Sequence, residues 1–149
     1  MRNRSRPVRA LTAICALAAL PGAALPTGAV TATVTGLRSA DGQVLACLTA
    51  DPHAFPSCDK DPDAHAIIVP ARKTVRIDFG RIPAGEYAIA LVHDENANGR
   101  LDKRLMMPRE GFGFSRNAPV RLGPPAFASA AFEVDAAGEH QAIRMRYMF

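Results

Sequence analysis

The sequence predicts an all-β protein: a single antiparallel β-sandwich of about seven strands, of the immunoglobulin-like or the transthyretin-like (prealbumin-like) class. Three observations support this prediction. Most segments alternate apolar and polar residues with a period of two, the pattern of a strand with one buried face. Glycine and proline turn signals separate these segments. No window of the sequence shows convincing helical periodicity.

The alternation is clearest in three segments. VTATVTGL at 30–37 alternates aliphatic residues with threonine, KTVRIDF at 73–79 alternates them with polar residues, and AIRMRYMF at 142–149 alternates them with arginine. By contrast, VLACL at 44–48 and YAIALV at 87–92 are apolar on both faces, as central strands of a sheet are. These five segments are therefore expected to be strands.

Turn chemistry joins the strands. The dipeptide Asp41-Gly42 predicts a hairpin between the first two strands. Pro83 and Gly85 predict a type I turn before YAIALV, and DAAGEH links the last two strands. PPAFASAAF is too short for more than one helical turn. The longest irregular stretch is the polar segment Asp94–Pro125, and loops of that length are usually functional or metal-organised.

Residues 1–29 are expected to be a secretory signal peptide, which leaves residues 30–149 as the single domain. MRNRSRPVR carries four arginines, ALTAICALAAL is a short apolar run, and PGAALPTGA supplies small residues, in the order typical of such a signal. Cleavage fits equally after Ala24 or after Ala29. The apolar run is about half the length of a membrane-spanning helix. We therefore expect a periplasmic or extracellular domain without a transmembrane segment.

The charge balance gives no support to a nucleic-acid partner. The chain has 18 basic and 14 acidic side chains, and the surplus lies entirely in the expected leader. The remaining domain is formally neutral and has no basic run, whereas nucleic-acid-binding domains usually carry a basic patch.

Cys47 and Cys58 are expected to form a disulfide, because an even pair of nearby cysteines in an exported protein is most simply explained that way. The alternative is a metal site that includes His53 or His65. Ten residues separate the two cysteines, which is more than the usual spacing of zinc-binding cysteines.

The stretch HDENANGRLD at 93–102 predicts a calcium-binding loop. Calcium prefers oxygen ligands, and a glycine permits the sharp bend that brings alternate side chains together. Arg100 would contribute its backbone carbonyl oxygen. The residues at positions 1, 3, 5, 6 and 9 of the calcium-loop pattern are Asp94, Asn96, Asn98, Gly99 and Asp102.

The twelfth position of the calcium pattern does not match. It is Leu105, where such loops place a bidentate glutamate. Glu110 would therefore have to complete the coordination shell, or Glu95 if the loop followed a different path around the ion. We therefore expect weak affinity, about 0.1–1 mM. The alternative is a surface loop whose Asp and Asn side chains bond their own backbone.

His93 and Glu95 offer a second chemistry. As neighbours on one strand face they could form the acid–base pair of a small periplasmic hydrolase. The sequence places no nucleophile beside them, and Ser115 is only the nearest serine in the loop that follows. We expect His93 to brace a loop at the strand end, and the protein not to be an enzyme.

The segment EGFGFSRNA at 110–118 lacks the third glycine of a phosphate-binding loop. Phe112 and Phe114 are expected to pack in the core, and the alternative is an aromatic platform for a sugar ring. Together with His93, Glu95 and Asn117, these two phenylalanines define a candidate binding surface.

The ending IRMRYMF also resembles the last strand of an outer-membrane barrel. Such a barrel needs at least eight long strands and aromatic girdles. The chain has no Trp and two Tyr, so the closing strand of a sandwich explains the pattern better.

Three long segments resemble the bacterial secreted family called domain of unknown function 2141. They are VTGLRSADGQVLACL, FGRIPAGEYAIALVHDENANGRLD and REGFGFSRNAPVRLGPPAFASAAFEV, and the resemblance covers about residues 30–145. It implies an exported β-sandwich, related in style to transthyretin-like and carboxypeptidase-regulatory-like modules, and no established activity. CLTADPHAFPSC looks like an insert held by its own disulfide. We therefore expect a binding or accessory module whose partner is an envelope protein, a glycan or a small molecule.

Overall fold

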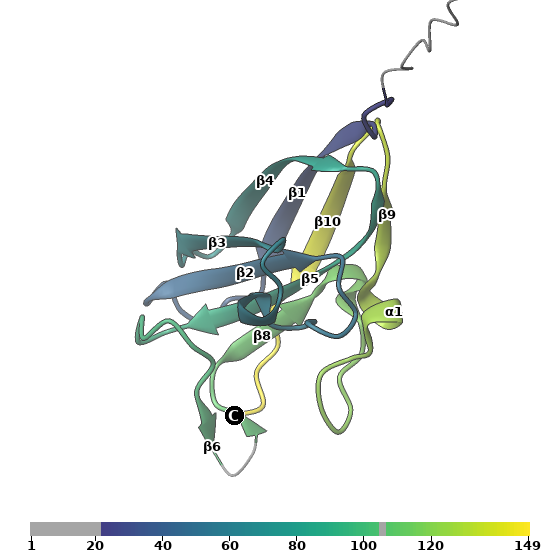
Figure 1. Cartoon of the computed structure of the whole chain (residues 1–149). Coiled ribbons are helices and arrows are strands. Elements are labelled where there is room, and N and C mark those ends of the chain that lie inside the picture. Colours follow the sequence, from purple (N-terminus) through teal and green to yellow (C-terminus); the bar gives the residue numbers. More distant parts are fainter. Residues whose placement is uncertain (1–21, 105–106) are drawn as a thin grey trace, which may run out of the picture.

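The computed structural model describes residues 22–104 and 107–149, and within them the protein is all-β, as the sequence predicts. Most strands lie in two sheets (Figure 1). The three-stranded sheet has the order β10 (Glu139–Arg144), β1 (Thr27–Thr35), β4 (Val75–Pro83). The five-stranded sheet has the order β3 (His65–Pro70), β2 (Gln43–Thr49), β5 (Gly85–Asp94), β8 (Gly111–Phe114), with β9 (Phe132–Val134) also paired to β5.

The remaining elements are short. They are the two-stranded ladder of β6 (Lys103–Arg104) and β7 (Met107–Pro108), the 3₁₀ turns η1 (Cys58–Lys60) and η2 (Ser115–Asn117), and the single-turn helix α1 (Phe127–Ala130). In the described part of the chain, no helix has the length and apolar character needed to cross a membrane. Most of the expected leader, residues 1–21, lies outside the described residues.

The hairpin prediction at Asp41-Gly42 is wrong. β1 and β2 belong to different sheets, so the connection between them crosses from one sheet to the other. Gly42 has φ +68°, and a Cβ atom there would lie 2.0 Å from the carbonyl oxygen of Asp94. The glycine therefore permits a close approach of two backbones, which a dipeptide pattern cannot distinguish from a hairpin turn.

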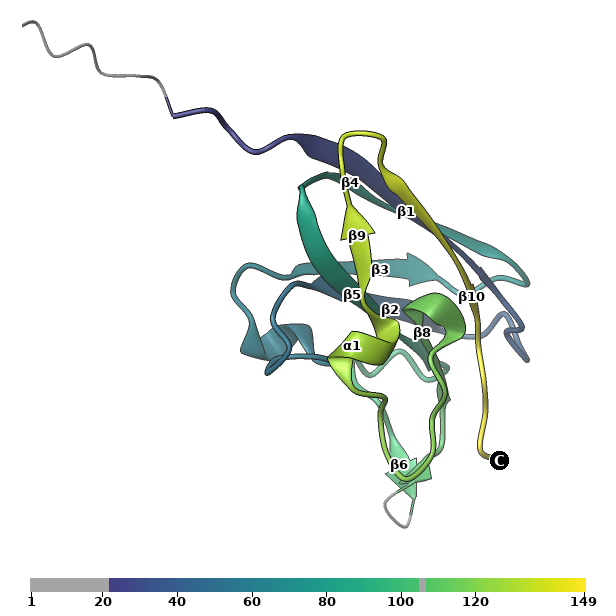
Figure 2. The same ribbon diagram turned by 90° about the vertical axis from the view of Figure 1, so that its right-hand side faces the viewer.

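The prediction of a purely antiparallel arrangement is also wrong at one pair. β1 pairs with β10 in parallel, from Val30 beside Glu139 to Thr35 beside Arg144, and with β4 in antiparallel. β9 and β10 are joined by the turn at Gly138, yet β9 pairs with β5 and β10 with β1. The first and last long strands of the chain are thus neighbours, as both views show (Figure 2).

The predicted alternation explains the main core. The inward residues of β1 and β4 are at most 7 % exposed, and they pack against inward residues of β2, β5 and β10. Ile89 and Leu91 of β5 join this cluster, whereas Ala88 and Ala90 join a second one around Phe55 and Phe114. The prediction that β5 is apolar on both faces is therefore confirmed, because each face meets its own apolar cluster.

The last strand is shorter than AIRMRYMF predicts. β10 ends at Arg144, after which the N–H of Met145 donates to the carbonyl of Thr35 at 2.8 Å. Arg146 and Phe112 then exchange two backbone hydrogen bonds of 2.8 and 3.0 Å. The chain thereby leaves the three-stranded sheet and joins the edge of the five-stranded one.

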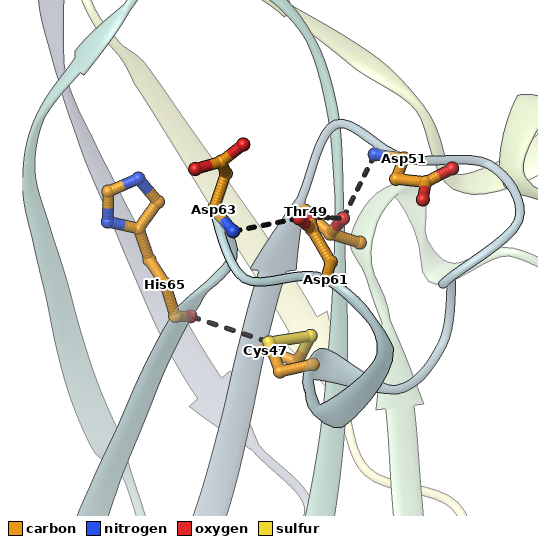
Figure 3. The surroundings of a disulfide bond; sticks show 7 residues. Cys47, Thr49, Asp51, Asp61, Asp63 and His65 are labelled. Carbon is orange, nitrogen blue, oxygen red and sulfur yellow. Dashed lines mark hydrogen bonds between the residues drawn. A yellow bond between two sulfur atoms is a disulfide. The ribbon is translucent and has the colours of Figure 1, made fainter.

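Cys47 and Cys58 form a disulfide, as the sequence predicts, with their Cα atoms 5.5 Å apart. It ties β2 to η1 in the segment that leads to β3 (Figure 3). Next to it, the Thr49 hydroxyl donates to the Asp61 carboxylate and accepts the N–H of Asp51 at 2.9 Å. The insert is therefore fixed by one covalent and several polar links.

Candidate functional site

The loop after β5 begins at Asp94, whose side chain is fully buried. Its carboxylate accepts hydrogen bonds from the side chain of Gln43 at 2.9 Å and from the N–H groups of Asn98 and Gly99 at 3.0 and 2.7 Å. Burial alone would raise the pKa of this carboxyl. The hydrogen bonds outweigh that effect and hold the pKa of Asp94 below its usual value.

Glu110 closes the same loop from the other side. It is 4 % exposed, and its two carboxylate oxygens accept the N–H of Glu95 at 3.1 Å and the N–H of Asp102 at 3.0 Å. Asp94 and Glu110 together satisfy backbone N–H groups at the start, middle and end of the loop. These hydrogen bonds fix the course of the loop from its first residue to its last.

The exposed half of the loop is a small polar cluster. The side-chain amides of Asn96 and Asn98 donate to the two carboxylate oxygens of Asp102 at 2.8 and 3.0 Å. These hydrogen bonds, first the one from Asn98, lower the pKa of Asp102. Arg100 extends into solvent, with its side chain 80 % exposed.

The structure thus brings all six predicted calcium ligands into one loop, but in two groups. The side chains of Asn96, Asn98 and Asp102 meet on its outer side. The carboxylates of Asp94 and Glu110 instead accept hydrogen bonds from backbone N–H groups. Within residues 22–104 and 107–149, no three His, Cys, Asp or Glu side chains gather as they do in a metal centre.

His93 is a fully buried brace between three segments. Its Nε2 lies 2.9 Å from the carbonyl oxygen of Asp41, and its Nδ1 lies 2.7 Å from the hydroxyl of Tyr147. The Tyr147 hydroxyl also accepts the N–H of Arg38 at 3.1 Å. Both ring nitrogens of His93 are therefore engaged, one by a carbonyl oxygen and one by a hydroxyl group.

Arg38 holds a second set of contacts, which we call the Arg38 clasp: Arg38, Glu95, Tyr147 and Phe149. The guanidinium of Arg38 forms a forked ion pair with Glu95, lies 4.6 Å from the centre of the Tyr147 ring, and donates to the carbonyl of Phe149 at 2.7 Å. The hydrogen bond from Arg38 is the main reason why the pKa of Glu95 lies below its usual value. Glu95 is therefore committed to Arg38 rather than to His93.

The Arg38 clasp was missed by sequence reasoning, because its members lie up to 111 positions apart. Arg38 lies in a loop, and nothing in the local sequence distinguishes it from the other surface arginines. The only signal in the sequence was Tyr147, a tyrosine in an alternating segment, whose hydroxyl needs a partner when the ring packs against a core.

The aromatic platform at Phe112 and Phe114 is contradicted by burial, and the core alternative is confirmed. The two side chains are 5 % and 8 % exposed. They pack with Phe55 of the disulfide-held insert, whose ring centre lies 5.8 Å from that of Phe114. The insert covers the face on which a sugar would have stacked, and His93 is equally inaccessible.

Asn117 and Ser115 have bracing roles. Asn117 donates to the carbonyl of Ala142 at 3.0 Å and accepts the N–H of Arg144 at 2.9 Å, so its amide completes the free edge of β10. The hydroxyl of Ser115 donates to the carbonyl of Ala130 at 2.6 Å and accepts the N–H of Ile89 at 2.9 Å. Both groups of contacts are structural.

Two depressions on the surface of the described residues, of about 460 and 440 Å³, are shallow and open. The first lies between β5, β9 and β10, and the second along the proline-rich loop before α1. Neither includes a residue of the Asp94–Asp102 loop. Their linings contain Glu86, Arg116, Glu133, Glu139 and Gln141 in the first and Arg121 and Leu122 in the second.

Comparison with known proteins gives one match. The model of a family described as "Uncharacterized protein conserved in bacteria (DUF2141)" matches residues 32–142. No curated protein and no solved structure matches the chain. The matched range contains Arg38, His93, Glu95 and the whole Asp94–Asp102 loop, and it ends before Tyr147.

Proposed function

The chain belongs to the DUF2141 family, and from this premise we propose that it is an exported, non-enzymatic binding module whose partner is another protein of the bacterial envelope. The family description carries no activity, so the support comes from the residues of this chain. The observation that carries the proposal is an exposed apolar pair, Met148 and Phe149, held in place by the Arg38 clasp.

Met148 and Phe149 are 43 % and 57 % exposed. They follow Tyr147, and the carbonyl of Phe149 is fixed by Arg38. Aromatic residues, methionine and arginine are enriched in protein–protein interfaces, and a pre-organised surface loses less entropy on binding. The exposed side chains of Met148 and Phe149, on a backbone that Arg38 fixes at Phe149, therefore favour a protein partner.

A small-molecule partner and a glycan have less support. Small ligands usually bind in concave sites that bury most of their surface, and the depressions among the described residues are open. A stacked sugar needs an exposed aromatic face, and Phe112 and Phe114 are buried.

The proposal that the protein is not an enzyme depends on the contacts of His93 and Glu95. A hydrolase built on this pair would need a substrate to reach the imidazole, yet His93 is fully buried and its ring nitrogens bond Asp41 and Tyr147. Glu95 is paired with Arg38, and the Ser115 hydroxyl contacts Ala130 and Ile89 instead.

Export is supported by the leader pattern and by the disulfide, since disulfides persist in oxidising compartments. Of the two cleavage positions, Ala24 is favoured. β1 already begins at Thr27, and Gly28 and Ala29 pair with Ile82 and Arg81 of β4. Cleavage after Ala29 would remove three paired residues of the strand.

Between the two sandwich classes, the strand order favours the transthyretin-like one. In the immunoglobulin arrangement the first two strands lie in the same sheet. Here β1 and β2 lie in different sheets, and β1 has the last strand, β10, as its parallel neighbour.

A photocrosslinking experiment in an exporting bacterial host tests the proposal. p-Benzoylphenylalanine replaces Phe149, or, as a matched control, Leu122, which is fully exposed on the loop before α1. We expect an adduct with one envelope protein at position 149 and none at position 122, and an intact mass of the uncrosslinked protein that begins at Leu25. Identical adducts at both positions, no adduct at either, or a hydrolysis of ester or peptide substrates that His93→Gln abolishes would contradict it.

Calcium is a second candidate, as a weak stabilising ligand rather than a cofactor. The observation in its favour is the meeting of Asn96, Asn98 and Asp102 on the outer side of the loop. Calcium prefers oxygen ligands, and binding here would exchange the contacts of the Asn96 and Asn98 amide oxygens with the N–H groups of Asn98 and Arg100 for contacts with the ion. Bound calcium at about ten times its Kd would stabilise the fold by roughly 1.4 kcal/mol.

The calcium prediction is checked by thermal melts. Calcium at millimolar concentration is expected to raise the melting temperature by a few degrees, and magnesium to raise it less. Asp102→Asn, which keeps the shape and removes the charge, should abolish the difference. Equal melting temperatures with calcium, magnesium and chelator would remove calcium from consideration.

A further inference from the structure

β3 is an edge strand with an unusual apolar surface. It pairs with β2 on one side, and no strand of the described ranges pairs with it on the other (Figure 1). Its sequence is HAIIVP, and Ile68 is 62 % exposed. Exposed apolar edge strands pair readily with other chains, and proteins usually protect them with charges, prolines or bulges.

The backbone groups on the free side of β3 can be identified from its register. Pro70 lies beside Gln43 of β2, and one position further the N–H of Ala71 donates to the carbonyl of Gly42 at 3.1 Å. Successive residues of a strand direct their backbone groups to alternate sides. His65, Ile67 and Val69 therefore bond β2, like Ala71. The residues whose backbone groups face outward are Ala66, Ile68 and Pro70.

We propose that β3 pairs in antiparallel fashion with β3 of a second copy of this chain, about a two-fold axis at Ile68. The two Ile68 residues then exchange both of their backbone hydrogen bonds. Ala66 faces Pro70 of the second copy, and its N–H donates to that proline's carbonyl. Proline has no N–H to offer, so it must face a donor, and this register supplies one at each end.

Charge is compatible with the same register. Asp63 lies five residues before Ile68, in the turn that precedes β3, and Lys73 five residues after it, in the bend that follows β3. An antiparallel pairing about Ile68 therefore brings the turn of each copy, with Asp63, towards the bend of the other, with Lys73. Both side chains are exposed, and in the part of the chain that the structure describes neither forms an ion pair. Figure 3 shows Asp63 beside His65 at the start of β3, where its carboxylate takes no part in the hydrogen bonds drawn.

The pairing also covers apolar surface on both faces of the strand. Ile67 and Val69 are half-buried against the main core and would lie beside each other across the axis. On the opposite face the two Ile68 side chains become neighbours. A six-residue strand buries less than the roughly 1,600 Å² of a standard interface, so a dimer with a Kd on the order of 10–100 μM is expected.

Sedimentation velocity of the processed protein, from about 1 μM to about 1 mM, measures this dimer. The wild type is expected to shift from monomer to dimer over that range. Ile68→Lys places two like charges at the axis and should give a monomer throughout. Leu122→Lys, an equally exposed change on the loop before α1, should leave the shift unchanged. A wild type that stays monomeric, or an Ile68→Lys variant that dimerises like it, overturns the proposal.

A charge exchange tests the register. Asp63→Lys and Lys73→Asp should each raise the Kd of the dimer about tenfold. The two-fold axis produces two Asp63–Lys73 pairs, and an exposed ion pair contributes up to about 1 kcal/mol. The double variant Asp63→Lys/Lys73→Asp restores both pairs and should dimerise as the wild type does. If the double variant dimerises as weakly as either single variant, the pairing about Ile68 is overturned. The same holds if β3 binds an extended peptide of another protein in preference to β3 of a second copy.

Discussion

Asp94→Ala is expected to lower the free energy of unfolding by about 3 kcal/mol, the largest effect of any single change in the polar loop. The carboxylate is fully buried and satisfies the side chain of Gln43 and the N–H groups of Asn98 and Gly99. Alanine leaves the side chain of Gln43 and the N–H of Gly99 without this acceptor, and leaves the N–H of Asn98 with Asn96 alone. Urea titration measures the loss, and Asp102→Ala, on the exposed side of the same loop, is expected to lose less.

The cost of Asp94→Ala is expected to depend on pH. The pKa of Asp94 in the folded protein lies below its ordinary value of 3.8, because hydrogen bonds outweigh the effect of burial. Its contribution to stability is therefore complete above that ordinary value and is lost as the pH falls through the folded pKa. The difference between wild type and variant should be constant at neutral pH and shrink below about pH 4. A difference that grows on acidification would contradict this account of the loop.

Removal of the disulfide with Cys47→Ala/Cys58→Ala is expected to lower the free energy of unfolding by about 3 kcal/mol. The two cysteines are 11 positions apart, and the cross-link restricts the unfolded chain over that loop. Cys58 also packs in the second cluster with Phe55 and Phe114, so the loss should extend to the insert.

Reductant supplies the control for the disulfide. It should lower the melting temperature of the wild type to that of the double variant and leave the double variant unchanged. A titration of free thiols in the unreduced wild type should find none from this pair. An unaltered melt of the wild type after complete reduction would show that the bond contributes nothing to stability.

Local pattern predicts much of this fold, because burial on one face imposes a period of two on a strand. Val30, Val34 and Ile77 all lie where that period places them. The pattern does not single out β3, whose residues are apolar without alternation. It also gives no information on which strands become neighbours. The pairing of β1 with β10 joins residues 109 positions apart, so only tertiary packing decides it.

The candidate site divides in the same way. The Asp94–Asp102 loop could be found because its polar residues lie close together in the sequence, and Cys47 and Cys58 because they form an even, closely spaced pair. The partners of His93, Asp41 and Tyr147, come from two other segments. A sequence can therefore present His93 as a free base, while the fold gives each of its nitrogens a partner.

The parallel pairing of β1 with β10 has a consequence for biogenesis. β1 is near the start of the chain and lies between β4 and β10, so its sheet lacks an edge strand until residues 139–144 have been delivered. Pairings between such distant segments are slow to form, because the long loop must close before any contact stabilises it. The order of the strands therefore keeps the three-stranded sheet incomplete until the last strand of the chain is available to pair with the first.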